Sequence, residues 1–211
     1  MRPDRRRFRL RTGAVAIPNS SDPFALFDSW YAEAAACADI EDHTAMTLAT
    51  ADAHGAPDAR QVLLKGHDER GFVFYTNLTS PKTDHLRHNP RAALCFYWMP
   101  LGKQVRIRGP VEMVTDEEAD AYFATRPRQS NLGAWASKQS QVIEQPLALE
   151  RRIARFVAKY LFGPVPRPEF WSGYRIMPER IEFWLKKPYR LHDRVCYSKT
   201  DTGWTRQRLY P

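Results

Sequence analysis

The chain changes its hydrophobic period soon after its first predicted helix, and this change constrains the fold more than any other feature. Phe24, Phe27 and Tyr31 recur at spacings of three and four residues, which predicts a helix that begins with Asp22 as N-cap and Pro23 in its first turn. Short β-rich segments bounded by Gly, Pro, Asp or Asn then follow at residues 44–50, 60–66, 71–77, 92–98 and 103–114. Strands and helices do not alternate regularly. We therefore expect an α+β fold, a closed or split β-barrel of mainly antiparallel strands with peripheral helices.

The rest of the chain predicts further helices and a C-terminal group of strands. Residues 51–59 indicate a hairpin loop, and residues 133–141 a loop rich in hydrogen-bonding groups. Three more helices are expected: one capped by Ser80 with Pro81 next, one opened by the capping box of Thr115 and Glu118, and one ending at Gly163. Strands are expected at 173–177, 180–185 and 189–197, with another at 203–210.

Composition and charge narrow the class of protein. The 211 residues, 43% of them hydrophobic, fit one globular domain over residues 21–211 after a flexible basic tail at 1–20. Six of the 32 basic residues lie within the first eleven positions, so most of the net charge of +8 belongs to the tail and does not indicate a nucleic-acid-binding face. No apolar run is long enough to cross a membrane. Three scattered cysteines without a CxxC pair fit a reducing cytoplasm and predict neither disulfides nor a metal site.

Several polar constellations could bind an anion, and each also has an ordinary structural interpretation. Tyr122 and Arg126 stand four residues apart at the end of a predicted helix, with Ser130 just beyond, which resembles a phosphate clamp. Dipole complementation at the helix end would explain Arg126 alone. The segments RQVLLK (60–65) and QVRIRG (104–109) could line an anion site or be solvated strand faces. His85 and His88 have a spacing that could hold a metal, but no third ligand is near and a surface pair is favoured.

The segment RLHDR (190–194) poses the same choice near the C-terminus. In a strand, Arg190, His192 and Arg194 would share one face, while Asp193 would lie on the other and pair with a neighbouring cation. Such a face is either a solvated edge or an anion pocket, and these five residues alone favour the edge. The preceding strand leaves Trp184 on the face opposite its aliphatic residues, where it could be core or a wall against a planar ring.

Taken together, the motifs resemble the pyridoxamine 5′-phosphate oxidase family. DPFALFDSW, RQVLLK, FYTN, SPK, KQVRIRGPVE, YFATRPRQSNLGAWASKQS, FWSGYRI, IEFW and RLHDR follow in that family's order and spacing from about residue 22 to the end. The resemblance implies an FMN-binding split barrel, a homodimer with FMN at the subunit interface, and C-terminal strands that serve dimerisation and the active site. It also implies oxidation of pyridoxamine or pyridoxine 5′-phosphate to pyridoxal 5′-phosphate, with dioxygen reduced to hydrogen peroxide.

The same resemblance implies a set of site residues. Those expected to bind FMN are Arg60, Gln61, Val62, Leu63, Leu64, Lys65, Tyr75, Thr76, Lys82, Gln104, Gln139, Ser140, Trp184 and Arg194. Those expected to bind the substrate are Lys65, Tyr122, Arg126, Ser130, Arg190 and His192, with Arg190 and His192 as the catalytic pair. Asp42 matches a position near the active site. No metal is expected.

The sequence departs from the family's pattern at two places, and three alternative functions remain open. Pro81 stands where the family usually has an arginine, and RRRFRLRTG stands where it tends to carry an acid–tyrosine lid segment, a role that Arg6 or Arg7 could take. A related flavin oxidase could act on another aromatic substrate of the phenazine type. The protein could also be a non-catalytic carrier of flavin or pyridoxal phosphate. The third alternative is a nucleic-acid-binding module that uses the tail.

Overall fold

A curled antiparallel sheet forms the body of the protein in the computed structural model, which describes residues 16–143 and 145–211. Ten strands make one sheet with the order β10-β9-β8-β6-β5-β1-β2, and β3, β4 and β7 branch from β6. Every strand pair among the described residues is antiparallel. The strands are β1 Ala45–Ala51, β2 Pro57–Leu63, β3 Gly66–Asp68, β4 Gly71–Asn77, β5 Arg91–Trp98, β6 Lys103–Met113, β7 Trp171–Ile176, β8 Arg180–Leu185, β9 Asp193–Thr200 and β10 Gly203–Arg208. The predicted α+β split barrel is confirmed.

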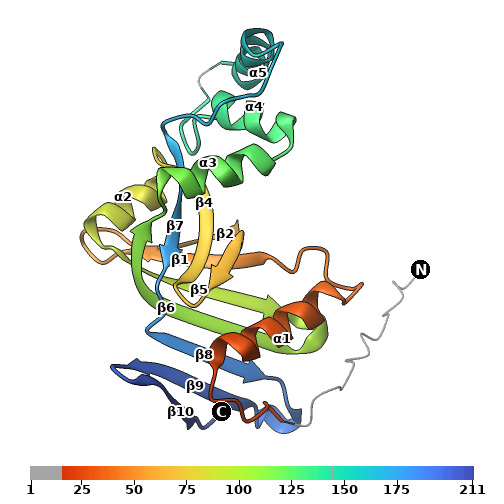
Figure 1. The fold of residues 1–211 in the computed structure, drawn as a ribbon, viewed down its shortest axis with the longest axis vertical. Coiled ribbons are helices and arrows are strands. Elements are labelled where there is room, and N and C mark those ends of the chain that lie inside the picture. The colour runs from red at the N-terminus through yellow and green to blue at the C-terminus, as the bar shows by residue number, and fades with distance from the viewer. Residues whose placement is uncertain (1–15, 144) are drawn as a thin grey trace.

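The long strand β6 joins the two parts of this sheet. Its first half pairs with β8 and its last residues pair with β7, so the sheet divides along β6. Gly109 lies at the division, where a Cβ atom would stand 1.8 Å from the carbonyl oxygen of Met177. Only glycine lets the two backbones approach this closely. The division curls the sheet into the half-barrel seen in Figure 1.

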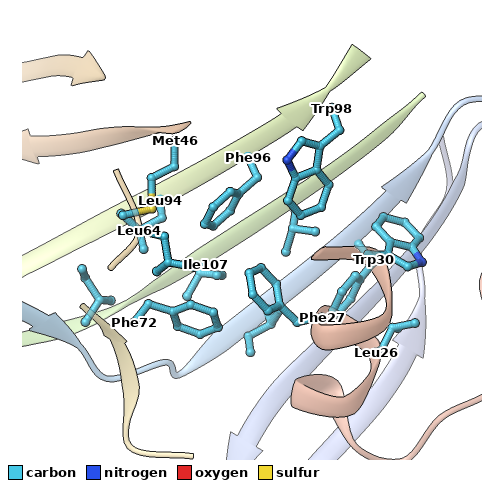
Figure 2. Close-up of a cluster of buried hydrophobic side chains, with 14 of the residues drawn as sticks. Leu26, Phe27, Trp30, Met46, Leu64, Phe72, Leu94, Phe96, Trp98 and Ile107 are labelled. Atoms are coloured by element: carbon cyan, nitrogen blue, oxygen red, sulfur yellow. The ribbon is translucent and has the colours of Figure 1, made fainter. Parts of the chain in front are cut away.

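The core lies between helix α1 (Pro23–Ala35) and the curled sheet. Asp22 caps the helix by accepting a hydrogen bond from the backbone N–H of Phe24, and Pro23 stands in the first turn, as predicted. Phe27 and Trp30 are buried completely or almost completely and point from the helix onto aromatic and aliphatic side chains of the strands (Figure 2). The rings of Phe27 and Phe96 have centroids 5.4 Å apart in an edge-to-face arrangement.

The other helices cluster toward one end of the sheet. They are α2 Pro81–His88, α3 Asp116–Thr125, α4 Arg128–Ala136 and α5 Ala148–Lys159. In Figure 1, α3, α4 and α5 lie at the end of β4 and β7 that is far from the C-terminal strands β8, β9 and β10. Two short 3-10 turns, Met99–Leu101 and Pro188–Arg190, complete the described elements. No helix of the described residues is long and apolar enough to cross a membrane.

Most local predictions are confirmed, and five are corrected. The strand predicted at 60–66 begins at Pro57, inside the predicted hairpin loop, and ends at Leu63. The capping box of Thr115 and Glu118 is present. Ser80 occupies the N-cap position of α2, but its hydroxyl makes no cap bond and donates to the carbonyl oxygen of Asn77. The predicted loop at 133–141 is helical up to Ala136, in α4. Helix α5 ends four residues before Gly163, and the predicted strand at 189–197 begins only at residue 193.

The described part of the predicted tail is anchored to the C-terminal strands. Ile17 is buried, and its backbone N–H donates to the carboxylate of Asp193 at 2.8 Å. The hydroxyl of Tyr197 donates to the carbonyl oxygen of Ser20 at 2.7 Å. The arginines proposed to replace the lid segment, Arg6 and Arg7, lie outside the described residues.

Candidate functional site

A polar cleft of about 740 Å³ opens between strands β2 and β4, the start of α2, and the α3–α4 connection. Predicted site residues that line it are Arg60, Gln61, Val62, Leu63, Lys65, Tyr75, Thr76, Lys82, Tyr122, Arg126, Ser130, Gln139 and Ser140. Asp58, Ala59, Pro81, Pro127 and Trp171 complete the lining. Residues that are far apart in sequence therefore converge on one cavity, and four of the side chains are cationic.

Lys82 is the most buried cation of the cleft, with 7% of its surface exposed. Helix α2 directs its ammonium toward three oxygens: Ser80 Oγ at 2.8 Å, Gln139 Oε1 at 3.0 Å and Thr76 Oγ1 at 3.1 Å. Burial, and then the positive charge of Arg60, lowers the pKa of Lys82 to about 8. A cation held this way is stabilised when an anion binds beside it.

Arg60 stands on β2, and its guanidinium is fixed by groups of neighbouring strands. Its Nη1 donates to Thr50 Oγ1 at 2.7 Å and to the carbonyl oxygen of Leu48 at 3.2 Å. Its Nη2 pairs with the carboxylate of Asp58. Because Arg60 contributes to the lowered pKa of Lys82, the two cations act on the same part of the cleft.

A cluster of three nearly parallel aromatic rings forms one wall of the cleft. The ring centroids of Tyr75 and Tyr122 are 4.2 Å apart, those of Tyr75 and Trp171 are 5.1 Å apart, and those of Tyr122 and Trp171 are 6.2 Å apart. Gly173 makes this arrangement possible, since a Cβ atom there would stand 2.7 Å from the ring of Tyr75. Burial raises the pKa of both tyrosines, which keeps the phenols protonated as hydrogen-bond donors near neutral pH.

Arg126 follows α3 directly and has an unused donor. Its guanidinium lies 4.7 Å from the ring centroid of Trp171, and its Nη2 donates to the carbonyl oxygen of Ser130 at 3.3 Å. Its Nη1 is buried and has no hydrogen-bond partner among the described residues. Burial lowers the pKa of the guanidinium. An unpaired buried donor of this kind is costly unless a ligand accepts from it, and an anionic oxygen is the acceptor that suits a guanidinium.

Sequence reasoning missed three residues that organise this cleft. Trp171 supplies the third ring of the aromatic cluster. Asn131 is buried on α4, and its side-chain amide donates to the carbonyl oxygens of Phe123 and Arg126, which fixes the turn that carries the predicted clamp. Thr50 holds Arg60. FWSGYRI marked the region of Trp171, but no local pattern identifies the partners of Thr50 or Asn131.

The remaining predicted residues do not line this cleft, and three of them stand on the strands β6, β8 and β9. Gln104 on β6 faces Trp184 on β8, which in turn faces Arg194 on β9, so the three stand side by side in register. The rings of Trp184 and His192 have centroids 4.5 Å apart. Leu64 is buried in the core, and Asp42 caps its own turn by accepting from the N–H of Thr44. None of these residues lines the cleft within the described chain.

The segment 190–194 is not the strand that alternation predicted. Pro188 opens a 3-10 turn, and Tyr189 and Arg190 adopt left-handed backbone conformations with φ of 57° and 64°. Strand β9 begins at Asp193, so Arg190, His192 and Arg194 do not share a strand face. Arg190 is exposed, and the Nδ1 of His192 accepts from the backbone N–H of Lys187 at 3.2 Å.

The predicted pairing of Asp193 with a cation is confirmed, and Arg194 pairs with a buried carboxylate. Asp193 binds Arg208 at 3.0 Å and the N–H of Ile17. Arg194 donates from both Nε and Nη2 to one carboxylate oxygen of Glu182, at 3.0 and 2.7 Å. Glu182 is almost fully buried at a strand position where alternation predicts the outer face, because arginine side chains cover it.

The donor groups of the cleft suit an anionic ligand better than a metal ion. No group of three or more metal-ligating side chains occurs among the described residues. His85 and His88 turn to different partners, Thr50 and the carbonyl oxygen of Asp84. Arg60 and Lys82 present two cations beside hydroxyl and amide groups, and this donor set fits a phosphate group. The cavity is also large enough for a cofactor-sized molecule.

Comparisons with solved structures place the fold in a class. The chain has a TM-score of 0.86 and 31% identity to the structure of PhzG from Burkholderia lata in complex with tetrahydrophenazine-1-carboxylic acid, covering 92% of this chain and 94% of that one. A pyridoxamine 5′-phosphate oxidase-related, FMN-binding protein from Nostoc punctiforme has a TM-score of 0.72 at 17% identity, over 91% of this chain and 100% of that one. The second likeness shows the fold alone. Fold and site thus define a split-barrel protein with a cationic cleft.

Sequence comparison is more specific. Residues 32–160 match the family described as pyridoxamine 5′-phosphate oxidase, and residues 171–211 match the C-terminal dimerisation region of pyridoxine 5′-phosphate oxidase. Pyridoxine/pyridoxamine 5′-phosphate oxidases from Nitrobacter hamburgensis and a Bradyrhizobium species are 57% and 56% identical, over 91% and 96% of this chain and 91% and 94% of theirs. The chain belongs to the pyridoxamine 5′-phosphate oxidase family. These likenesses indicate a flavin cofactor and self-association through the C-terminal region.

Proposed function

We propose that the protein is an FMN-dependent oxidase that converts pyridoxine 5′-phosphate or pyridoxamine 5′-phosphate to pyridoxal 5′-phosphate, with dioxygen as the electron acceptor. The observation that carries this proposal is the convergence of four cationic side chains on one cleft. We assign Arg60 and Lys82, whose charges interact, to a first group, and Lys65 and Arg126 to a second. Two phosphate-bearing molecules, cofactor and substrate, need two such groups.

The first group fits the phosphate of FMN. Lys82 offers an ammonium already surrounded by Ser80, Thr76 and Gln139, and Arg60 adds a planar guanidinium. Pro81 lines the cleft where the family usually has an arginine, so this chain relies on the two cations and the neighbouring polar groups. Ser140, in the left-handed conformation with φ of 68°, brings its turn to the cleft edge.

The second group fits the phosphate of the substrate. Arg126 has the buried, unpartnered Nη1, and Tyr122 places a phenol on the same wall. Ser130 and Lys65 also line the cleft. When bound, FMN supplies the redox chemistry by accepting a hydride from the substrate and passing electrons to dioxygen. The protein's own part is to hold both phosphates so that the reacting atoms meet in a fixed orientation.

The residues that lie away from the cleft belong, in this proposal, to the same site in a homodimer. Gln104, Trp184 and Arg194 stand on strands that adjoin the matched dimerisation region or lie within it. A second copy that brings this row to the cleft would place FMN at the subunit interface. Arg190 and His192 would then border the reacting carbon, where Arg190 stabilises developing negative charge and His192 orients substrate or carries a proton.

A related oxidase acting on a phenazine-type aromatic is the second candidate, and the likeness to PhzG supports it. The two candidates differ in their need for the phosphate clamp. A pyridoxine phosphate oxidase must lose most of its turnover when the substrate lacks phosphate, whereas a phenazine-type oxidase has no use for Arg126 and Lys65. The curated relatives above 50% identity favour the first candidate.

The flavin spectrum of the purified protein is the first test. We expect a yellow protein whose cofactor is released as FMN, and an apoprotein that regains its absorbance with FMN more readily than with riboflavin. A colourless protein that FMN cannot reconstitute would refute the proposal. A substrate panel on the reconstituted protein then separates the two candidates: pyridoxine phosphate, pyridoxine, and an unphosphorylated tricyclic aromatic.

A further inference from the structure

A buried threonine connects the two elements that supply the cations of the cofactor phosphate site. Thr50, on β1, is 4% exposed. Its Oγ1 accepts a hydrogen bond from Arg60 Nη1 at 2.7 Å and lies 3.0 Å from the Nδ1 of His85. Neither Thr50 nor His85 lines the cleft, yet the two lie directly behind Arg60.

The chemistry of the groups fixes the direction of the first hydrogen bond. A guanidinium only donates, so Arg60 donates to the threonine oxygen. The hydroxyl of Thr50 also forms a hydrogen bond with the Nδ1 of His85, and the tautomer of the imidazole decides which of the two donates. The result is a chain of hydrogen bonds that runs from helix α2 through strand β1 to strand β2.

This series of hydrogen bonds holds Arg60 in place against the electrostatic repulsion between Arg60 and Lys82. Lys82 and His85 stand one turn apart on α2, so the helix that carries His85 also brings the ammonium of Lys82 into the cleft. The charge of Arg60 contributes to the lowered pKa of Lys82, which shows that the two cations repel each other. Without a bound anion, Arg60 would turn away unless neighbouring groups held it. Thr50, the carbonyl oxygen of Leu48 and Asp58 hold it.

We propose that Thr50 and His85 are positioning residues that set the guanidinium of Arg60 for the phosphate of FMN. The inference rests on the proposed function, because it needs FMN as the ligand. It also gives His85 a role that its sequence spacing did not suggest. The alternative is that Thr50 is only a satisfied buried hydroxyl, whose loss would affect folding and not the phosphate.

The test compares FMN with riboflavin, which has the same ring and no phosphate. Flavin fluorescence is titrated with the full-length apoprotein of the wild type and of Thr50→Val, Thr50→Ser and Thr205→Val. Thr50→Val is expected to weaken FMN binding about tenfold, as the loss of one charge-assisted hydrogen bond does. Riboflavin binding should stay unchanged. Thr50→Ser, which keeps the hydroxyl, and Thr205→Val, a remote change on β10, should bind both flavins like the wild type.

A second pair of variants and a double mutant keep the inference open to refutation if Thr50→Val folds poorly. His85→Leu removes the hydrogen-bond partner of Thr50 and should weaken FMN binding about threefold, while His85→Asn offers an amide that can donate or accept and should restore it. In an Arg60→Met background, Thr50→Val should have no further effect on FMN affinity. The inference would be overturned if Thr50→Val weakened the binding of FMN and of riboflavin equally. It would also be overturned if Thr50→Val weakened FMN binding as much in the Arg60→Met background as in the wild type. If the wild type binds FMN and both Thr50→Val and His85→Leu bind it with the same affinity, the inference fails while the proposed function stands. A wild type without affinity for FMN would refute the proposed function as well.

Discussion

The lowered pKa of Lys82 predicts that FMN affinity depends on pH in a range where the phosphate itself does not titrate. Lys82 has a pKa of about 8 in the free protein. Its ammonium is therefore about nine-tenths protonated at pH 7 and about one-tenth protonated at pH 9. A bound phosphate favours the ammonium and returns its pKa toward the ordinary lysine value of about 10.4. The phosphate group, with a second pKa near 6, stays dianionic over this range.

Linkage gives the magnitude. At pH 9 the protein must take up almost one proton when it binds FMN, whereas at pH 7 it takes up very little. Its affinity for FMN should therefore fall about tenfold between pH 7 and pH 9, or by about 1.4 kcal/mol. The sign of the stability effect is opposite. Because the folded-state pKa of Lys82 lies below its unfolded value, the unfolded chain holds the extra proton between about pH 8 and pH 10, and this group's contribution to stability rises with pH. Weaker binding at pH 9 would therefore not reflect a loss of fold at Lys82.

The assay is a fluorescence titration of apoprotein with FMN from pH 7 to pH 9.5, with riboflavin as the phosphate-free control. Lys82→Met should bind FMN weakly at every pH and lose the pH dependence. Riboflavin affinity should be flat in both proteins. A wild type whose FMN affinity is constant from pH 7 to pH 9, or a Lys82→Met variant that retains the full slope, would show that Lys82 does not carry the phosphate.

Three further substitutions test other parts of the account. Arg126→Met, which removes the unpartnered buried donor, should raise the KM for pyridoxine phosphate about 10- to 100-fold with the flavin retained; an unchanged KM would exclude Arg126 from the substrate site. Arg190→Met should keep the flavin spectrum and lose most of the turnover, and full turnover would remove Arg190 from catalysis. Asp193→Ala leaves the buried N–H of Ile17 without its acceptor and should lower the free energy of unfolding, measured by urea denaturation, by about 1–3 kcal/mol. A change below about 0.5 kcal/mol would contradict the role of Asp193 in anchoring the segment around Ile17.

The sequence predicted those elements whose signals are local. Asp22 and Pro23 mark the start of α1, and the alternation Val105–Arg106–Ile107 on β6 separates buried from exposed positions as expected. Helix α4 escaped prediction because it has no side-chain cap. Arg128 at its start donates to the carbonyl oxygens of Tyr160 and Gly163 across the neighbouring segment, and such support is visible only in the tertiary structure.

The segment 188–194 shows the same limit at the site. Its residue types favour a strand, yet Tyr189 and Arg190 take left-handed conformations that no local pattern indicates. The cleft residues were predicted through family resemblance, residue by residue. Thr50 and His85, which support Arg60, could not be predicted from the sequence. They are separated by 35 positions, and their contact depends on how β1 and α2 pack.

The most direct test of the central claim is the product balance of the FMN-loaded protein. Pyridoxine 5′-phosphate in air-saturated buffer should yield pyridoxal 5′-phosphate and hydrogen peroxide in equal amounts, and pyridoxine without phosphate should react at a small fraction of that rate. Aldehyde and peroxide absent from the reaction, or equal rates with and without the phosphate, would contradict a cleft built to hold two phosphates.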